Sequence, residues 1–220
     1  MLAPMRVGTY TFESKHDPDG PLILEPRKKF DLKCFLSEED ASLRGFSRSF
    51  PFFVIGGAVL NEGLLIGSQG DGVNTHFHYD EGEIIVLANN FELNDRGRTE
   101  WVPDGALIRA FRSELNALRE FTSSGFYSPH LTESFAQLFD ESHTREAINQ
   151  LFGALYCTVP MPPELEDFFK RINRHVAREI MTCDWEEHPK SALVFNNALG
   201  FHRGVYNEGA GQELHRVVLP

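Results

Sequence analysis

The chain has 220 residues, of which 41% are apolar, so it can bury a full hydrophobic core and extensive disorder is not expected. Its formal net charge of −11 at pH 7 would repel a phosphate backbone over most of the surface, which argues against a nucleic-acid partner. No apolar run approaches the roughly 20 residues that a bilayer-spanning helix needs, so no membrane partner is expected.

The first stretch of the chain, to about residue 104, alternates between strand-like runs and turn residues. Runs rich in β-branched and aromatic residues predict strands, and the Gly, Pro and Asn residues between them predict turns. The strand-like segments are Val7–Phe12, Phe52–Leu60, Val73–His78, Glu83–Ala88 and Thr99–Val102. Ser37, followed by Asp40, marks the expected start of a short helix, because a Ser oxygen can accept from a free N–H group there.

The second stretch, about 105–188, has helical periodicity. Apolar residues recur at intervals of three and four, which places them on one face of a helix. Three such stripes begin at Leu107, Ile148 and Leu165, and the last one runs to Ile180 after the start signal Pro162-Pro163. Core packing is the expected role of these stripes.

The third stretch returns to strands, with Ala192–Asn196, Phe201–Tyr206 and Leu214–Leu219 as the expected segments. Strands, then a helical block, then strands predict a mainly β fold, a sandwich or barrel with a helical insertion. The last strands are too few to fold alone, so a single domain over 1–220 is expected. Its β core would comprise about 1–104 and 190–220, with the insertion at about 105–188.

The cysteines and the N-terminus indicate the compartment. Cys34, Cys157 and Cys183 are far apart and odd in number, which favours reduced thiols over a disulfide framework or a zinc site. The first residues contain no apolar segment of the kind that a secretory signal requires. A cytoplasmic location is therefore expected.

The first candidate for chemistry is the pair His78 and Asp80. Residues two apart in a strand point to the same side, so an imidazole and a carboxylate would project together. This pair suits a divalent metal, and a second imidazole from elsewhere would complete a two-His-one-carboxylate facial triad with open positions for oxygen chemistry. The alternative is a histidine at a strand end that simply bonds to a neighbouring acid.

The second candidate is the segment that ends in His202 and the strand that follows it. A β-run passes through the polar turn Asn196-Asn197 to His202, and the next strand carries Arg216. An Arg one strand away from a metal-binding His can reach across the mouth of a barrel and bind a carboxylate with both arms of its fork. The alternative is a surface hairpin with an ordinary surface Arg.

Together these segments resemble the Fe(II)/2-oxoglutarate-dependent oxygenases, which carry His-x-Asp, a distant His and a following Arg in this order. Residues 94–103, NDRGRTEWVP, look like the G-x-T-E-x-V-P strand of the phytanoyl-CoA hydroxylase-like branch. Residues 193–204 look like that branch's segment running from Leu-x-Phe to His-x-Gly. The resemblance covers about half of the chain, mainly 73–104 and 190–219.

The resemblance implies a double-stranded β-helix core of the jelly-roll type and a set of roles. His78, Asp80 and His202 would hold Fe(II), and Arg216 would bind the distal carboxylate of 2-oxoglutarate. Thr99 would line the cosubstrate site. Two departures from the family pattern are that Asp104-Gly105 follows Pro103 without the usual Ser and His, and that His202 lies unusually far from Arg216, which leaves Arg203 as a rival cosubstrate ligand.

The implied reaction is the oxidation of a small molecule with O2, with succinate and CO2 as coproducts. Halogenases of this superfamily have a small residue at the carboxylate position, so Asp80 favours hydroxylation or desaturation. The insertion at about 105–188 would lie near the barrel mouth and act as a substrate lid, or else as a buttress or dimer interface. The substrate and the oligomeric state are left open.

Two alternatives come from other classes. A cupin-type metalloenzyme without 2-oxoglutarate would use His76, His78 and Glu83, although the second cupin motif would place Ile108 where a His is needed. A non-catalytic jelly-roll binding module would use the helical block to hold a partner.

Overall fold

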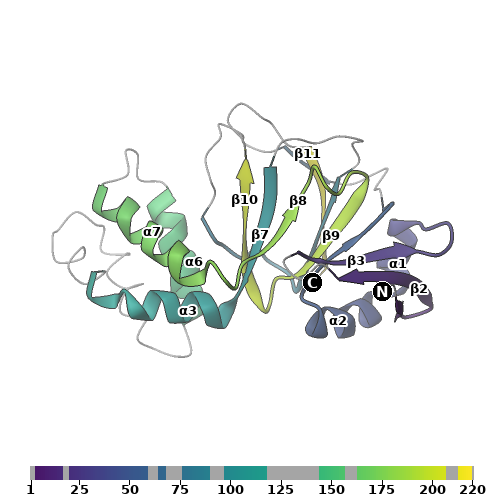
Figure 1. Ribbon diagram of the computed structural model, residues 1–220, viewed down its shortest axis with the longest axis horizontal. Coiled ribbons are helices and arrows are strands. Elements are labelled where there is room, and N and C mark those ends of the chain that lie inside the picture. Colours follow the sequence, from purple (N-terminus) through teal and green to yellow (C-terminus); the bar gives the residue numbers. More distant parts are fainter. Residues whose placement is uncertain are drawn as a thin grey trace.

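The computed structural model describes residues 3–16, 20–58, 64–67, 76–89, 97–117, 144–156, 163–206 and 213–219. Within these ranges the chain forms two β-sheets with helices on both sides (Figure 1). The prediction of a mainly β structure with a helical insertion is therefore confirmed. None of the helices in the described ranges is both long and apolar enough to cross a membrane.

Among the described residues, the larger sheet has eight strands and the smaller sheet has three. Neighbouring strands are antiparallel except for the parallel pair β3–β4. In spatial order, the larger sheet consists of β1 (Ala3–Val7), β2 (Tyr10–His16), β3 (Leu22–Pro26), β4 (Phe52–Ile55), β9 (Ser191–Asn196), β6 (Ile84–Asn89), β11 (Glu213–Leu219) and β5 (Leu64–Gly67). The smaller sheet consists of β10 (Gly200–Tyr206), β7 (Gly97–Pro103) and β8 (Met181–Asp184).

The space between the two sheets is filled by an inner core to which both contribute. Trp101 of the smaller sheet and Phe195 of the larger one belong to it, and the Trp101 indole Nε1 donates to the Asn196 carbonyl at 3.2 Å. All six residues of β9 are buried because each of its faces is covered. Leu193 and Phe195 face the inner core, whereas Val194 alternates to the outer side.

Two groups of helices cover the outer faces of the sheets, on opposite sides of the strands (Figure 1). α1 (Leu32–Glu38) and α2 (Asp40–Ser49) pack on the outer face of the larger sheet through residues such as Phe35 and Leu43. α3 (Asp104–Ser113), α6 (Thr144–Tyr156) and α7 (Pro163–Val176) pack on the outer side of the smaller sheet, against Val102 and Phe201. The apolar stripes of the described helices are core, as expected.

Several predicted element boundaries are wrong. The segment Val7–Phe12 is a hairpin rather than one strand, because Gly8 adopts a φ of +59° and reverses the chain between β1 and β2. A helix begins at Leu32 rather than at Ser37, since the Asp31 side chain accepts from the Cys34 N–H at 2.9 Å.

The helical stretch also ends earlier than the sequence predicts. Helix α7 stops at Val176, and Met181–Asp184, which lies inside the predicted helical stretch of 105–188, is strand β8 paired with β7. The pairing with β7 overrides the local pattern there. The apolar residues Leu118 and Phe121 of the first predicted stripe lie outside the described residues.

Candidate metal centre

The segment 76–80 brings the first two candidate ligands to the edge of the smaller sheet. The sequence predicts a strand over Val73–His78, but within the described residues 76–80 only His78 forms a β-bridge, to His202. The His78 N–H donates to the His202 carbonyl at 2.9 Å, and the His202 N–H donates to the His78 carbonyl at 2.8 Å. Two histidines that are far apart in the sequence are thus joined directly through their main chains.

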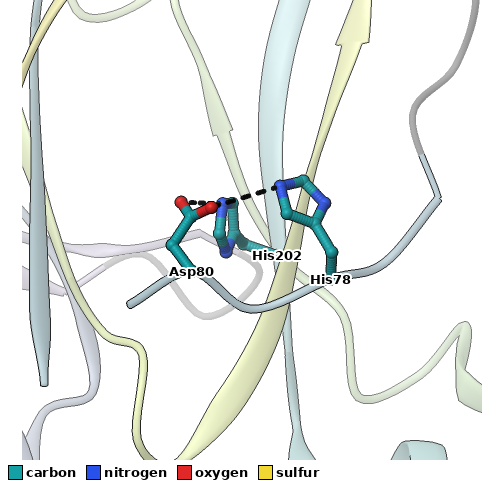
Figure 2. A group of neighbouring side chains, drawn as sticks. All are labelled: His78, Asp80 and His202. Carbon is teal, nitrogen blue, oxygen red and sulfur yellow. Dashed lines mark ion pairs between the residues drawn. The ribbon is translucent and has the colours of Figure 1, made fainter. Parts of the chain in front are cut away.

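His78, Asp80 and His202 converge on one point, as Figure 2 shows. One ligand atom from each residue lies within 4.8 Å of the other two. His202 Nε2 is 3.3 Å from Asp80 Oδ2, and His78 Nε2 is 4.0 Å from Asp80 Oδ1. Among the described residues this is the one group of three His, Cys, Asp or Glu side chains with such spacing.

The two imidazoles are oriented by their surroundings. His78 Nδ1 lies 2.9 Å from the carbonyl oxygen of His76, and a carbonyl can only accept, so Nδ1 carries a proton and Nε2 is the ring nitrogen that faces Asp80. Metal-ligating histidines commonly have this outer hydrogen bond. The His202 ring is buried and packs on Phe195, with 4.7 Å between ring centroids.

The charges at the site suit a cation. Burial lowers the pKa of His202 to about 4, helped by the neighbouring His78 and opposed by the hydrogen bond to Asp80, so the ring is neutral at pH 7. Burial by itself raises the pKa of Asp80, but the hydrogen bond from His202 and the Coulombic interactions with His202, His78 and Arg216 outweigh it and lower that pKa. A neutral imidazole and an ionised carboxylate are the forms that bind metals.

Arg216 lies beside this group. It shares the inward side of β11 with Leu214, and its Nη2 is 2.6 Å from Asp80 Oδ2. Its Nε is buried and has no hydrogen-bond partner among the described residues, and the same holds for His202 Nδ1. Arg216 therefore has a charged contact to the ligand group and a further donor to offer to a carboxylate.

Arg203, the rival arginine, points the other way. Its Nε and Nη2 lie 2.7 and 2.6 Å from Glu100 Oε2, and its Nη1 donates to Asn173 Oδ1 at 2.8 Å. The guanidinium also lies 4.2 Å from the centre of the Phe77 ring. These contacts occupy Arg203, so it is not available to the site.

Thr99 is buried on β7, two residues before Trp101, which is paired with His202. It is on the same side of the sheet as His202, but its hydroxyl accepts from Trp185 Nε1 at 3.0 Å. The structure therefore gives Thr99 a structural partner, and its role at a cosubstrate site stays a prediction.

The structure does not bring together His76, His78 and Glu83, the ligand set of the cupin alternative. The His76 ring stacks on Phe169, with 4.4 Å between centroids. The Glu83 carboxylate is 2.7 Å from Arg44 Nη1, in an ion pair on the side of α2. Neither side chain joins His78 in a group with metal-ligand spacing, so this alternative is wrong about its ligands.

Sequence reasoning missed two asparagines that hold the ligand segment. Asn197 bonds to the main chain of Asp80 on both sides of that residue, and Asn149 of α6 accepts from the Tyr79 N–H at 2.9 Å. The polar turn at Asn196-Asn197 is visible in the sequence, but the amide's partner lies 117 residues away along the chain. Only the fold reveals the contact.

Comparisons with known proteins support the fold. No protein-family model matches the sequence, and no curated protein matches it. The structure of AAD-2 in complex with Mn(II) and N-oxalylglycine is 14% identical to this chain with a TM-score of 0.50, over 100% of this chain and 97% of AAD-2. The PvcB protein of Pseudomonas aeruginosa is 16% identical with a TM-score of 0.52, over 100% and 91% of the two chains.

A second PvcB structure, described as an Fe, alpha-ketoglutarate dependent oxygenase from an isonitrile synthetic pathway, is 15% identical over 100% of this chain and 91% of PvcB, with a TM-score of 0.52. At such identities the likeness establishes the overall fold. This chain thus shares its fold with solved structures of an iron- and 2-oxoglutarate-dependent oxygenase.

The residues present fit an iron ion and a dicarboxylate. Two imidazoles and one carboxylate match the donor set that non-haem Fe(II) oxygenases use. Arg216 Nε, which has no hydrogen-bond partner among the described residues, matches a ligand that brings its own carboxylate.

Proposed function

We propose that this protein is a non-haem Fe(II)- and 2-oxoglutarate-dependent oxygenase. His78, Asp80 and His202 would hold the iron, Arg216 would bind the distal carboxylate of 2-oxoglutarate, and Thr99 would line the cosubstrate site. One observation carries the proposal: residues from segments more than 120 positions apart place a His-Asp-His group within 4.8 Å, with the Arg216 guanidinium against it.

Each residue has a definite task in this chemistry. With 2-oxoglutarate and O2, such a centre puts one oxygen atom into a substrate C–H bond and the other into succinate, with release of CO2. The chain itself orients the imidazoles through the His76 carbonyl and Phe195, and buries His202 away from water. Arg216 would neutralise and orient the dicarboxylate.

The substrate class follows from the site and the surface. Asp80 occupies the position that halogenases leave small, which favours hydroxylation or desaturation. The net charge of −11 argues against nucleic acid, and a small molecule is the substrate we propose.

Several finer predictions belong to the same proposal. The placement in the phytanoyl-CoA hydroxylase-like branch rests on the motifs at 94–103 and 193–204. The double-stranded β-helix core is supported by two facing sheets that share one inner core. The single domain over 1–220 and the cytoplasmic location stay predictions.

The helical block is proposed to border the substrate site. Phe169 of α7 stacks on His76, and α6 bonds to Tyr79, so both helices contact the segment that carries the ligands. These contacts support either a lid or a buttress, and residues 118–143 lie outside the described residues.

An anaerobic titration tests the proposal. Fe(II) followed by 2-oxoglutarate should produce a weak visible charge-transfer band with the wild-type protein, and O2 should then yield succinate. R216K keeps the charge but loses the fork, so we expect it to bind Mn(II) normally and to need at least roughly tenfold more 2-oxoglutarate for the same band. R203K, on the other face of the smaller sheet, is the matched control and should behave as the wild type.

The outcomes separate the alternatives. No band and no thermal stabilisation by 2-oxoglutarate in the presence of Mn(II) would support a non-catalytic binding module instead. Metal binding without any effect of 2-oxoglutarate would support a metalloenzyme of another kind. Equal loss of 2-oxoglutarate binding in R216K and R203K would remove Arg216 from its proposed role.

A further inference from the structure

The ligand segment lacks the support that a β-ladder normally provides. Beyond the single bridge at His78, the main chain of Tyr79 and Asp80 has no strand partner among the described residues. A backbone N–H or C=O that is half-buried needs a partner, and here side-chain amides supply it. The position of the Asp80 carboxylate therefore depends on those amides.

Asn197 holds Asp80 from both sides. Its Oδ1 accepts from the Asp80 N–H at 3.2 Å. Its Nδ2 donates to the Asp80 carbonyl at 2.6 Å and to the Gly82 carbonyl at 2.9 Å. One buried amide thus uses its acceptor and both of its N–H groups on the ligand segment, as a neighbouring strand would.

The same residue is linked to the other half of the metal centre. Asn197 precedes His202 by five residues in the connection between β9 and β10. Its own N–H donates to the Glu83 carbonyl at 2.8 Å, and its carbonyl accepts from Arg145 Nη2. The segment that precedes His202 is therefore hydrogen-bonded directly to the segment that carries Asp80.

Helix α6 also contacts the ligand segment, from the side of the helical block. Asn149 Oδ1 accepts from the Tyr79 N–H at 2.9 Å. One turn earlier, the Arg145 guanidinium lies 3.9 Å from the centre of the Tyr79 ring and also donates to the Gly200 carbonyl at 3.3 Å. Arg145 and Asn149 are four apart and share one face of α6, which points this face at the ligand segment.

We propose that Asn197 is a positioning residue of the metal centre, which sets the placement of Asp80 relative to His202, and that Asn149 of α6 supports it at Tyr79. The proposal deepens the proposed function and rests on it, because it assumes that the His-Asp-His group binds a metal. An Asp at 197 could keep the acceptor but would lose both donors and face two carbonyl oxygens, so only an amide of this length satisfies all three partners.

The matched control is the neighbouring Asn196. It is equally buried, and it uses its side chain on Ser47 Oγ at 3.1 Å and on the Ala198 N–H at 3.0 Å, with no bond to the ligand segment. N196A therefore removes a buried amide from the same turn without touching Asp80. N149A removes the hydrogen bond from the Tyr79 N–H to α6, and N149D keeps an acceptor for it.

The experiment compares N197A, N197D and N196A in three measurements. Hydrogen–deuterium exchange of the metal-free protein should show loss of protection at 79–82 in N197A, which removes the acceptor of the Asp80 N–H, and not in N196A. Affinity for Mn(II) should fall by about ten- to a hundredfold in these variants, as is typical when an outer partner of a ligand is lost. The visible spectrum with Co(II), which reports coordination geometry, should change in N197A and N197D and stay as wild type in N196A.

The hydrogen bond from Tyr79 to α6 is tested in the same way. N149A should lose exchange protection at Tyr79 and should weaken Mn(II) binding less than N197A does. N149D should restore the protection and the Mn(II) affinity. Melting temperature is measured throughout, so that an effect of general destabilisation is recognised.

Each outcome has a separate meaning. If N196A and N197A weaken Mn(II) binding equally at equal loss of melting temperature, Asn197 is only a structural residue and the proposal fails. Wild-type affinity and spectrum in N197A or N197D overturn it as well. If the wild-type protein binds neither Mn(II) nor Co(II), the proposed function fails with it, whereas the exchange data still tell whether Asn197 holds the segment.

Discussion

Two consecutive residues of strand β10 lie on opposite faces of the smaller sheet and have different surroundings. His202 faces inward with Trp101, beside Asp80 and Phe195, whereas the next residue, Arg203, faces outward with Glu100 and Asn173. Successive side chains of a strand point to opposite sides, so a step of one residue separates the candidate metal centre from the interface with helix α7.

The groups around Arg203 and those around His202 differ in how they are paired. Outside, Glu100 is bonded by Arg203 and also by Arg98 Nε at 2.7 Å, and its side chain is only 4% exposed. Inside, His202 Nδ1 and Arg216 Nε have no partners among the described residues. A closed network around Glu100 stabilises the fold, whereas buried polar atoms without partners beside a ligand group indicate a binding site.

The largest effect should come from the inward residue. We expect His202→Ala to weaken Mn(II) or Fe(II) binding by more than roughly a hundredfold, beyond the ten- to hundredfold that loss of an outer partner typically costs. Isothermal titration of the metal measures it, with Arg203→Ala as the control that should stay within a few-fold of wild type. Unchanged metal affinity in His202→Ala would remove this histidine from the centre and return the question to other ligand sets.

The outward residue should instead affect stability. Arg203→Ala leaves Glu100 buried with Arg98 as its remaining charged partner, and we expect a loss of about 2–4 kcal/mol in the free energy of unfolding, near the range for breaking a buried pair. Urea denaturation measures it. The matched control is Arg109→Ala, whose exposed pair with Glu179 at 2.9 Å should contribute less than about 1 kcal/mol. Equal losses in the two variants would contradict the contrast between closed network and surface pair.

The smallest effect is expected at Thr99, which shares the inward side with His202. Thr99→Val keeps the shape but removes the acceptor of Trp185 Nε1, so the free energy of unfolding should fall by about 1–2 kcal/mol. If Thr99 also lines the cosubstrate site, 2-oxoglutarate binding should weaken a few-fold, and Thr99→Ser should keep both properties. A stability loss with unchanged 2-oxoglutarate affinity would leave Thr99 with a structural role alone.

Much of the candidate site could be predicted from residue types and order. The order of His78 and Asp80, a distant His202 and a following Arg216 resembles a known family, and that resemblance predicts the group that the structure assembles. The strand predicted for the first pair is not seen at 76–80, since among these described residues only His78 forms a β-bridge. Side-chain hydrogen bonds from Asn197 take the place of strand pairing at Asp80, and no local sequence pattern predicts a hydrogen bond between residues 117 positions apart.

The sequence by itself determined the broad fold and the chemistry of the candidate ligands, because hydrophobic periodicity and side-chain type are local properties. It predicted β6, β7, β9, β10 and β11 to within one or two residues, and it left Arg203 and Arg216 as rivals. The tertiary structure places Glu100 and Asn173 against Arg203 and Asp80 against Arg216, which favours Arg216 as the cosubstrate ligand that we propose. It also decided which amides hold the ligands, because contacts between distant segments arise only when the chain has folded.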